Sequence, residues 1–192
     1  MTHWGTLDYV VVDLEGNGGQ PPDLVELAVV PIIGGIVGEP WSWLVRPSQP
    51  ITRFVTGIHG ISNEDVIDAP LFADVEAAVR AALVASALVG HNAAVDVGVL
   101  QRKLDRWECP EVFDTLTLAR RLLPGRDSYS LSALVAEFDL AAGLGGDLRP
   151  HRAVYDAVVT ARLFVHIADG RTLEQLRSQP PGRGQDDQLG LF

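Results

Sequence analysis

The segment Tyr9-Val-Val-Val-Asp13-Leu-Glu15-Gly16 decides the fold, because it has the pattern of a buried strand that ends in two carboxylates. A run of β-branched and aromatic residues is typical of a central strand that is covered on both faces. Side chains two positions apart on a strand project from one face, so Asp13 and Glu15 should point together. For this pair taken alone, the alternative is a solvated strand end.

Buried carboxylates are costly unless they are protonated or neutralised, and a divalent cation neutralises them most simply. Open α/β sheets also bind ligands at the carboxyl ends of their strands, which is where Asp13 and Glu15 fall. We therefore expect a metal site at the end of this strand.

The length and composition predict a single domain with a sizeable hydrophobic core. The chain has 192 residues, of which 47% are hydrophobic. No apolar run approaches the roughly 20 residues of a membrane span, and the first residues lack the pattern of a secretion signal. Cys109 is the single cysteine and has no partner for a disulfide or a zinc-binding pair. We expect a cytoplasmic protein without a membrane partner.

The formal net charge of −10 argues against a protein that coats duplex nucleic acid through a broad basic surface. It does not exclude an enzyme that binds a short nucleic-acid end. Clustered carboxylates that bind cations themselves make the net charge more negative.

The rest of the pattern predicts three antiparallel strands followed by alternating helices and strands. Gly34-Gly35 supplies a hairpin turn after the second strand, and Ser62 with Asp65 has the form of a capping box that opens a short helix. This order implies an α/β fold with a mixed five-stranded sheet flanked by helices. The later strands and helices are expected at 24–33, 41–45, 71–86, 87–90 and 93–106, and then at 130–138 and 152–168. Between 106 and 130 we expect a short strand that ends at Phe113-Asp114 and a helix that follows it through Leu123.

Two later motifs add polar side chains that could join the first pair. In Gly90-His-Asn-Ala-Ala-Val-Asp96, Asn92 and Asp96 are four apart, which places them on one face of a helix. In Pro150-His151-Arg-Ala-Val-Tyr-Asp156, the histidine and the aspartate would lie about 140° apart around an ideal helix. They can converge only if His151 lies on a non-helical lead-in to the helix.

Four acids and a histidine in this order resemble the DEDDh family of 3′–5′ exonucleases, of the proofreading epsilon-subunit type. The match covers nearly all of residues 7–170, and Gly57-Ile-His-Gly-Ile61 and Asp114-Thr-Leu-Thr-Leu-Ala119 also look like that family. The resemblance implies an RNase H-like fold and an exonuclease-like domain over residues 1–178.

By this resemblance the catalytic residues are Asp13, Glu15, Asp96, His151 and Asp156. Asp13 would bridge two divalent cations, Glu15 and Asp156 would complete the first metal's shell, and Asp96 would hold the second largely through water. Two Mg²⁺ or Mn²⁺ ions roughly 3.5–4 Å apart supply a nucleophilic hydroxide and charge relief on the leaving oxygen. Oxygen ligands favour these ions over zinc. His151 would act as general base, a contribution of about 10²–10⁴-fold.

Substrate-binding residues are expected at Gly16, Asn17, His59 and Asn92. Asn92 would orient the substrate strand or the helix that follows it. The family usually has two threonines where Gly16 and Asn17 stand and an aromatic residue where Val95 stands. Both departures affect the pocket for the 3′ end rather than the metal ligands.

Several polar residues have structural interpretations as well. His59 is alternatively a surface or capping residue, and His91 is expected to make a structural hydrogen bond. Asp114 is expected to cap the next helix.

Residues 179–192 have the composition of a flexible tail. The terminal Gln188-Leu-Gly-Leu-Phe192 resembles the bacterial sliding-clamp-binding pentapeptide, so that Gln188, Leu189, Leu191 and Phe192 would bind a clamp. The alternative is that these apolar residues pack back onto the domain.

These observations predict a two-metal-ion 3′–5′ exonuclease that releases nucleoside 5′-monophosphates from single-stranded or frayed ends, with DNA favoured over RNA. Its partners would be 3′-end nucleic acid, the clamp and a DNA polymerase, in replication proofreading or repair. One alternative is a catalytically weak, nuclease-like adaptor module in such an assembly. Another is an exoribonuclease that acts on RNA, since discrimination depends on the terminal 2′-hydroxyl.

Overall fold

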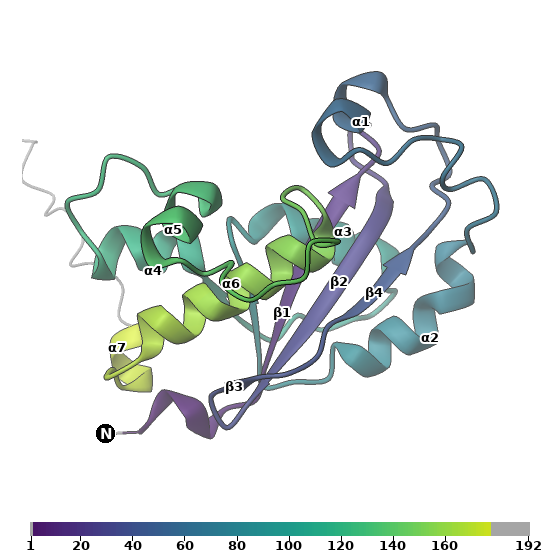
Figure 1. Ribbon diagram of the computed structural model, residues 1–192. Helices are drawn as coiled ribbons and strands as arrows, with labels where there is room; N and C mark the ends of the chain where they lie inside the picture. Colours follow the sequence, from purple (N-terminus) through teal and green to yellow (C-terminus); the bar gives the residue numbers. More distant parts are fainter. Residues whose placement is uncertain (1, 178–192) are drawn as a thin grey trace, which may run out of the picture.

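The computed structural model describes residues 2–177, and strand β1 (Tyr9–Gly16) lies at the centre of its sheet (Figure 1). β1 pairs antiparallel with β2 (Leu24–Ile33) and parallel with β5 (Ala87–Gly90). The edge strand β6 (Glu111–Asp114) is parallel to β5. The expected mixed sheet is therefore confirmed.

The sheet has six strands rather than the expected five. β3 (Ile36–Val37) pairs with the end of β2 directly after the turn at Gly34 and Gly35, whose φ angles of 59° and 83° suit a tight hairpin. The chain then leaves the sheet through Pro40 and returns as β4 (Trp41–Leu44), which also pairs with β2. The additional strand forms because the turn brings its two residues back into register.

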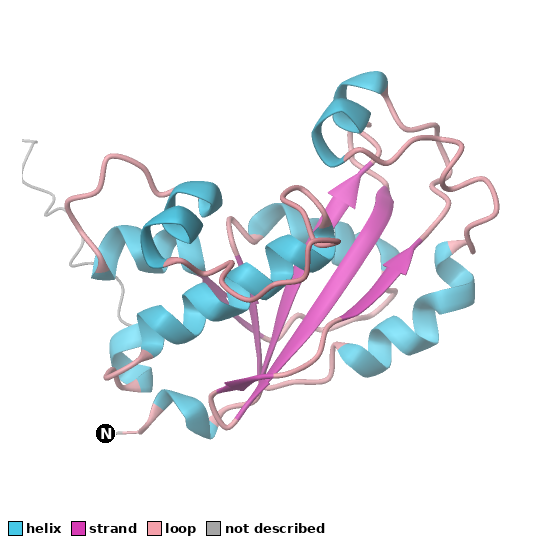
Figure 2. Cartoon of the chain, viewed as in Figure 1, coloured by secondary structure: helices cyan, strands magenta, loops and turns pink. Residues whose placement is uncertain are grey.

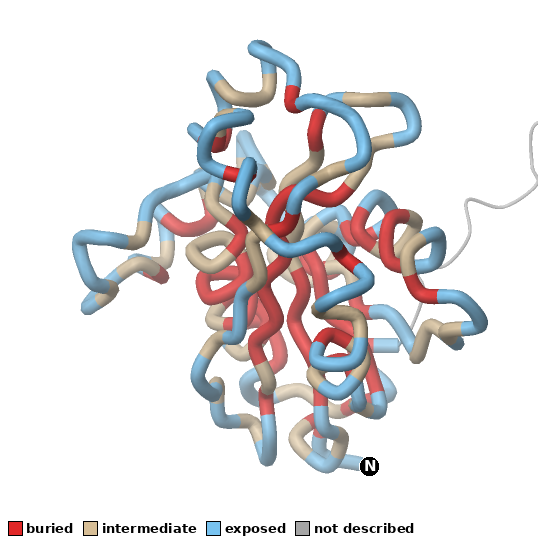
Figure 3. Tube along the Cα trace, turned by 90° about the vertical axis from the view of Figure 1, so that its right-hand side faces the viewer, coloured by how far each residue is buried: buried red, intermediate tan, exposed pale blue. Residues whose placement is uncertain are grey.

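Helices cover both faces of the sheet (Figure 2). Tyr9 and Val11 of β1 pack toward α6 (Ala153–Ala168), whereas Val10 and Val12 pack toward α2 (Phe72–Ala82) and α3 (Ala94–Lys103). Figure 3 shows the resulting core, with the strands buried between exposed helical surfaces. Helices α4 (Thr115–Leu122), α5 (Leu131–Phe138), α6 (Ala153–Ala168) and α7 (Leu173–Arg177) lie on the first face, and α2 (Phe72–Ala82) and α3 (Ala94–Lys103) lie on the second.

The short helix near the end of β1 begins earlier than expected (Figure 1). It is α1 (Arg53–His59), which stops at Gly60 with φ 75°, and residues 63–68 form turns. Ser62 and Asp65 do exchange the capping-box hydrogen bonds, but Pro70 follows too soon for a helix to extend from them. The prediction of a helix opening at Ser62 is therefore wrong.

The other predicted helices lie close to their expected bounds, and Ser130 caps α5 as expected. The single-turn helix η1 (Trp4–Thr6) and the short α7 were not predicted. None of the helices within residues 2–177 has the length and apolar character needed to cross a bilayer. Residues 179–192, which include the expected clamp-binding motif, lie outside the described part of the chain.

Candidate active site

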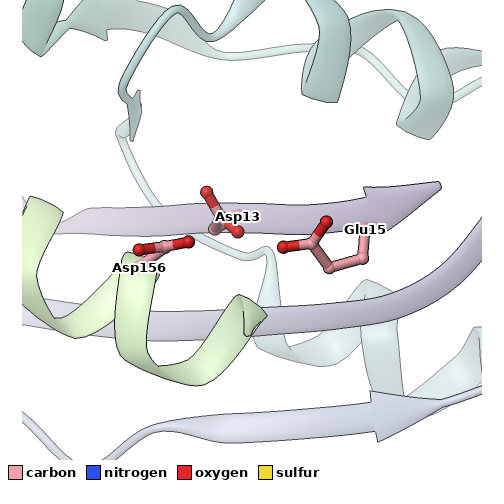
Figure 4. Close-up of side chains that lie close together, drawn as sticks. All are labelled: Asp13, Glu15 and Asp156. Atoms are coloured by element: carbon pink, nitrogen blue, oxygen red, sulfur yellow. The ribbon is translucent and has the colours of Figure 1, made fainter. Parts of the chain in front are cut away.

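Three carboxylates converge where α6 crosses the end of β1. Asp13 and Glu15 continue the row of β1 side chains that faces α6, and Asp156 lies in the first turn of that helix (Figure 4). Each offers one oxygen, and these oxygens all lie within 4.8 Å of one another. The alternation of β1 and the position of α6 thus bring together residues more than 140 positions apart.

The electrostatics of this cluster favour bound protons or a bound cation. Burial raises the pKa of Asp13 well above its ordinary value, and the charges of Asp96, Asp156, Glu15 and Glu26 raise it further. Burial, followed by the charges of Asp156 and Glu26, raises the pKa of Glu15 to about 8. A half-buried set of oxygen donors that repel one another fits a hard divalent cation, which would displace the protons.

Asp96 lies beside the three carboxylates and not among them. It is buried in the first turn of α3, where burial raises its pKa to about 7 and the backbone amides of Asp96 and Leu14 lower it. Its charge nevertheless raises the pKa of Asp13. Asp96 is thus close enough to act on a charge held by Asp13.

His151 lies outside the helix that carries Asp156, as the two side chains require if they are to converge. It precedes the N-cap residue Arg152, so it is outside α6, and it adopts a left-handed φ of 62°. Its backbone N–H donates to Asp156 Oδ2 at 3.0 Å. Its imidazole makes no hydrogen bond with another residue in the 2–177 range, and it lines a pocket of about 410 Å³ with Asp156 and Tyr155. The imidazole is therefore open to the pocket that it shares with Asp156.

Asn17, one of the residues expected to bind substrate, makes structural hydrogen bonds. Its side chain is buried, and its Oδ1 accepts hydrogen bonds from the N–H groups of Gly19 at 3.0 Å and Asp23 at 2.9 Å. Its Nδ2 donates to the carbonyl of Gln49 at 3.3 Å. These bonds organise the loop after Gly16, which itself ends β1 beside the cluster.

His59 is likewise buried rather than directed at a substrate. Its Nδ1 accepts the N–H of Ile61 at 3.0 Å, so the neutral ring donates from Nε2 to the carbonyl of Gly16 at 3.3 Å. Burial lowers its pKa, which favours this neutral form. These hydrogen bonds agree with the structural interpretation of His59, because the ring fixes α1 against the end of β1.

Asn92 does not share a helical face with Asp96. α3 begins only at Ala94, and Asn92 turns the chain with φ 63° while its N–H donates to Asp114 Oδ1 at 3.0 Å. Asp114 also caps α4, as expected. The expected hydrogen bond of His91 is present too, between its Nδ1 and the hydroxyl of Thr115 at 2.9 Å. Asn92 is exposed near the site, but as part of a turn.

One residue near the cluster was not singled out from the sequence. Glu26 is buried in β2, and its Cα is paired with that of Glu15 in the antiparallel register. Its position as the single acid within an apolar strand could have identified it, because a buried charge needs a partner.

The pKa shifts predict how stability depends on pH without metal. The pKa values of Glu15 and Asp96 rise to about 8 and about 7, from ordinary values of 4.5 and 3.8. Acids that bind protons more strongly in the folded state stabilise it at low pH, and this stability is lost as pH rises through the folded pKa values. In a chelator, the melting temperature should therefore fall between about pH 4 and about pH 8.

Mn²⁺ should stabilise the protein more at the alkaline end of this range, because the carboxylates must lose their protons to bind it. Thermal unfolding with Mn²⁺ and with chelator across the pH range measures this difference. The same stabilisation at every pH would contradict the assignment of these acids as ligands.

Comparisons with known proteins agree with the geometry. A family model described as Exonuclease matches residues 10–164. Exodeoxyribonuclease 10 of Escherichia coli (strain K12) is 37% identical over 168 residues, which are 86% of this chain and 72% of that protein. The 3′–5′ exonuclease DinG of Bacillus subtilis (strain 168) is 33% identical over 179 residues, which are 90% of this chain but only 18% of DinG.

Solved structures give the same result. Exonuclease X in complex with 5′ overhanging duplex DNA aligns with a TM-score of 0.72 and 36% identity, over 88% of this chain and 96% of that one. These matches confirm the expected RNase H-like arrangement of a mixed sheet flanked by helices. Because the matched segment contains the carboxylate cluster and His151, the chain belongs to the exonuclease family, among its metal-dependent 3′–5′ exonucleases of the DEDDh type.

Proposed function

We propose that this protein removes nucleotides one at a time from 3′ ends of single-stranded or frayed DNA, using two Mg²⁺ or Mn²⁺ ions. The observation that carries the proposal is the convergence of carboxylate oxygens of Asp13, Glu15 and Asp156 within 4.8 Å of one another. The His151 imidazole, which has no hydrogen-bond partner among the described residues, lines a pocket with Asp156. DNA is favoured because Exonuclease X, at 36% identity, was solved with duplex DNA that has a 5′ overhang and hence a recessed 3′ end.

The chain's own groups divide the work of hydrolysis. Asp13, Glu15 and Asp156 would hold one cation, and Asp96 would hold a second, largely through water. The ions supply Lewis-acid activation of water and neutralise charge on the leaving oxygen. His151 would accept the proton of the attacking water. The hydrogen bond from its backbone to Asp156 keeps it at the edge of the cluster.

Digestion of matched single-stranded DNA and RNA, each labelled at the 5′ end, tests this function. We expect DNA products that shorten stepwise from the 3′ end, with nucleoside 5′-monophosphates released, only when Mg²⁺ or Mn²⁺ is present. A 3′-end-labelled DNA should lose its label in the first turnover, which distinguishes this polarity from internal cleavage.

Other outcomes identify the alternatives. Faster digestion of RNA would favour an exoribonuclease. Stabilisation by metal without hydrolysis of either strand would favour the adaptor module, since a ligand of the folded state raises thermal stability whether or not catalysis follows. Cleavage from the 5′ end would contradict the proposed function.

We further propose that residues 179–192 tether the enzyme to a bacterial sliding clamp through Gln188, Leu189, Leu191 and Phe192. The proposal rests on the sequence of this tail and on the net charge of −10, which disfavours unaided binding to DNA. A short peptide would bind with a dissociation constant of about 1 μM. The tether could nevertheless hold the enzyme near a primer end at up to about millimolar effective concentration. A polymerase at that end would be the further partner.

Deleting residues 188–192 should abolish clamp binding and leave hydrolysis of short free oligonucleotides unchanged. Surface plasmon resonance on an immobilised clamp measures the first effect, and a double variant, Leu191→Ala with Phe192→Ala, should reproduce it. Clamp binding that survives the deletion would contradict the tether. A lower melting temperature after the deletion would indicate that the tail packs on the domain.

A further inference from the structure

The buried Glu26 binds Arg152 through a two-pronged ion pair. Glu26 is only 4% exposed, and its Oε2 accepts the Arg152 Nε–H at 2.9 Å while its Oε1 accepts an Nη2–H at 2.5 Å. Two parallel hydrogen bonds between a guanidinium and a carboxylate fix their relative orientation as well as their distance. The pair joins β2 to the start of α6, which are 126 residues apart in the chain.

The same carboxylate caps α6. Its Oε2 also accepts the N–H of Ala153 at 3.0 Å, the first residue of the helix. Arg152, the N-cap residue, provides no capping hydrogen bond from its own side chain. A negative charge at a helix N-terminus is favourable, because it satisfies a free N–H and meets the positive end of the helix dipole. Glu26 thus replaces the missing cap and attaches the first turn of α6 to the sheet.

Two site residues depend on that turn. Asp156 lies in it, and His151 immediately precedes the cap. His151 also holds a left-handed φ of 62°, which is unfavourable for a residue with a side chain and persists only where the surrounding structure enforces it. Two contacts enforce it: the hydrogen bond from its N–H to Asp156 and the ion pair that anchors the next residue, Arg152, to Glu26.

Glu26 itself is not placed to bind the cation. Both of its oxygens are engaged by Arg152 and the helix N-terminus. Like charges directly opposite each other on neighbouring strands repel, and Glu26 faces Glu15 in this way. Arg152 offsets that repulsion.

We propose that Glu26 and Arg152 are positioning residues, which hold His151 and Asp156 in register with the carboxylates of β1. The proposal rests on the proposed function of His151 and Asp156. Glu26 of β2 and Arg152, the residue after His151, thus act together on the first turn of α6.

Glu26→Gln removes the ion pair with Arg152 but retains the helix cap, because the amide oxygen can still accept the Ala153 N–H. We expect kcat to fall about 10–100-fold, as for other residues that orient metal ligands, with KM for a DNA oligonucleotide nearly unchanged. Arg152→Lys keeps the positive charge but loses the two parallel hydrogen bonds, so kcat should fall by a similar factor. Val79→Ala, a cavity variant on the opposite face of the sheet, is the control, and it should lower thermal stability without lowering kcat.

Two measurements separate positioning from loss of stability. In a His151→Ala background, Glu26→Gln should lower kcat by a much smaller factor than it does in the wild-type protein. One of the two groups that Glu26 positions is absent in that background. In the metal-free protein, hydrogen exchange in Glu26→Gln should accelerate at the amides of Ala153 and Asp156 and stay unchanged at Leu163 and Phe164 of the same helix.

Each result has a contradicting counterpart. A Glu26→Gln effect confined to KM would indicate substrate binding instead, and full additivity with His151→Ala together with unchanged exchange at Ala153 would overturn the proposal. Because exchange is measured without metal or substrate, it tests the positioning role even if the wild-type protein proves not to be an exonuclease.

Discussion

Asp13→Asn should abolish hydrolysis while the protein stays folded. Asp13 is central to the cluster, and the neighbouring charges that raise its pKa are those of Asp96, Asp156, Glu15 and Glu26. An amide of the same shape removes one negative charge from this group, so the metal-free variant should be more stable than wild type at alkaline pH. Loss of a bound cation removes several kcal/mol of transition-state stabilisation, which corresponds to about 10³-fold or more in kcat.

The measurements are kcat on single-stranded DNA and the melting temperature with and without Mn²⁺. The variant should lose both activity and the stabilisation by metal. Asp105→Asn is the matched control, since Asp105 is highly exposed and distant from the cluster in the chain, and it should change neither quantity. An Asp13→Asn protein that still cleaves DNA, or that gains as much stability from Mn²⁺ as wild type, would contradict the assigned role.

His151→Ala should separate catalysis from metal binding. The imidazole is exposed and makes no hydrogen bond with the described residues, and it is the backbone of His151, not its ring, that bonds to Asp156. Removing a general base typically costs about 10²–10⁴-fold in rate. We therefore expect kcat to fall by about that factor while Mn²⁺ raises the melting temperature as in wild type.

His166→Ala provides the control for this substitution. His166 is exposed near the other end of α6, and its ring is tilted against that of Phe138, so its loss should leave kcat unchanged. If His151→Ala cleaves as fast as wild type, the one-histidine mechanism is wrong for this protein. If it loses stabilisation by metal, His151 acts on the cation rather than on the water.

The parts of the site that follow from local geometry were predictable from the sequence. The alternation of side chains along β1 placed Asp13 and Glu15 on one face, and the helical angle between His151 and Asp156 required a histidine outside the helix, as found. Both features depend only on the period of one strand or one helix. The order of the motifs along the chain indicates the family without any knowledge of how the strands pair.

The parts that were missed depend on contacts between distant segments. His59 bonds to Gly16 and Asn17 bonds to Gln49, across 43 and 32 residues, and these contacts bury two side chains that were expected to face a substrate. The shift of Asn92 out of α3 follows from Asp114 on the next strand, which accepts its N–H. No periodicity within a segment reports such partners.

The role of Glu26 was hidden for the same reason. Its position in an apolar strand marked it as a buried charge that needs a partner. The partner, Arg152, lies 126 residues away and can be identified only when the register of β2 and the start of α6 are known.

Anomalous scattering from crystals grown with Mn²⁺ tests the central claim most directly, because it locates the cation without relying on turnover. The account predicts a manganese peak within coordination distance of carboxylate oxygens of Asp13, Glu15 and Asp156, and no peak there in Asp13→Asn. Fully occupied manganese elsewhere on the protein, with none between these three carboxylates, would contradict it.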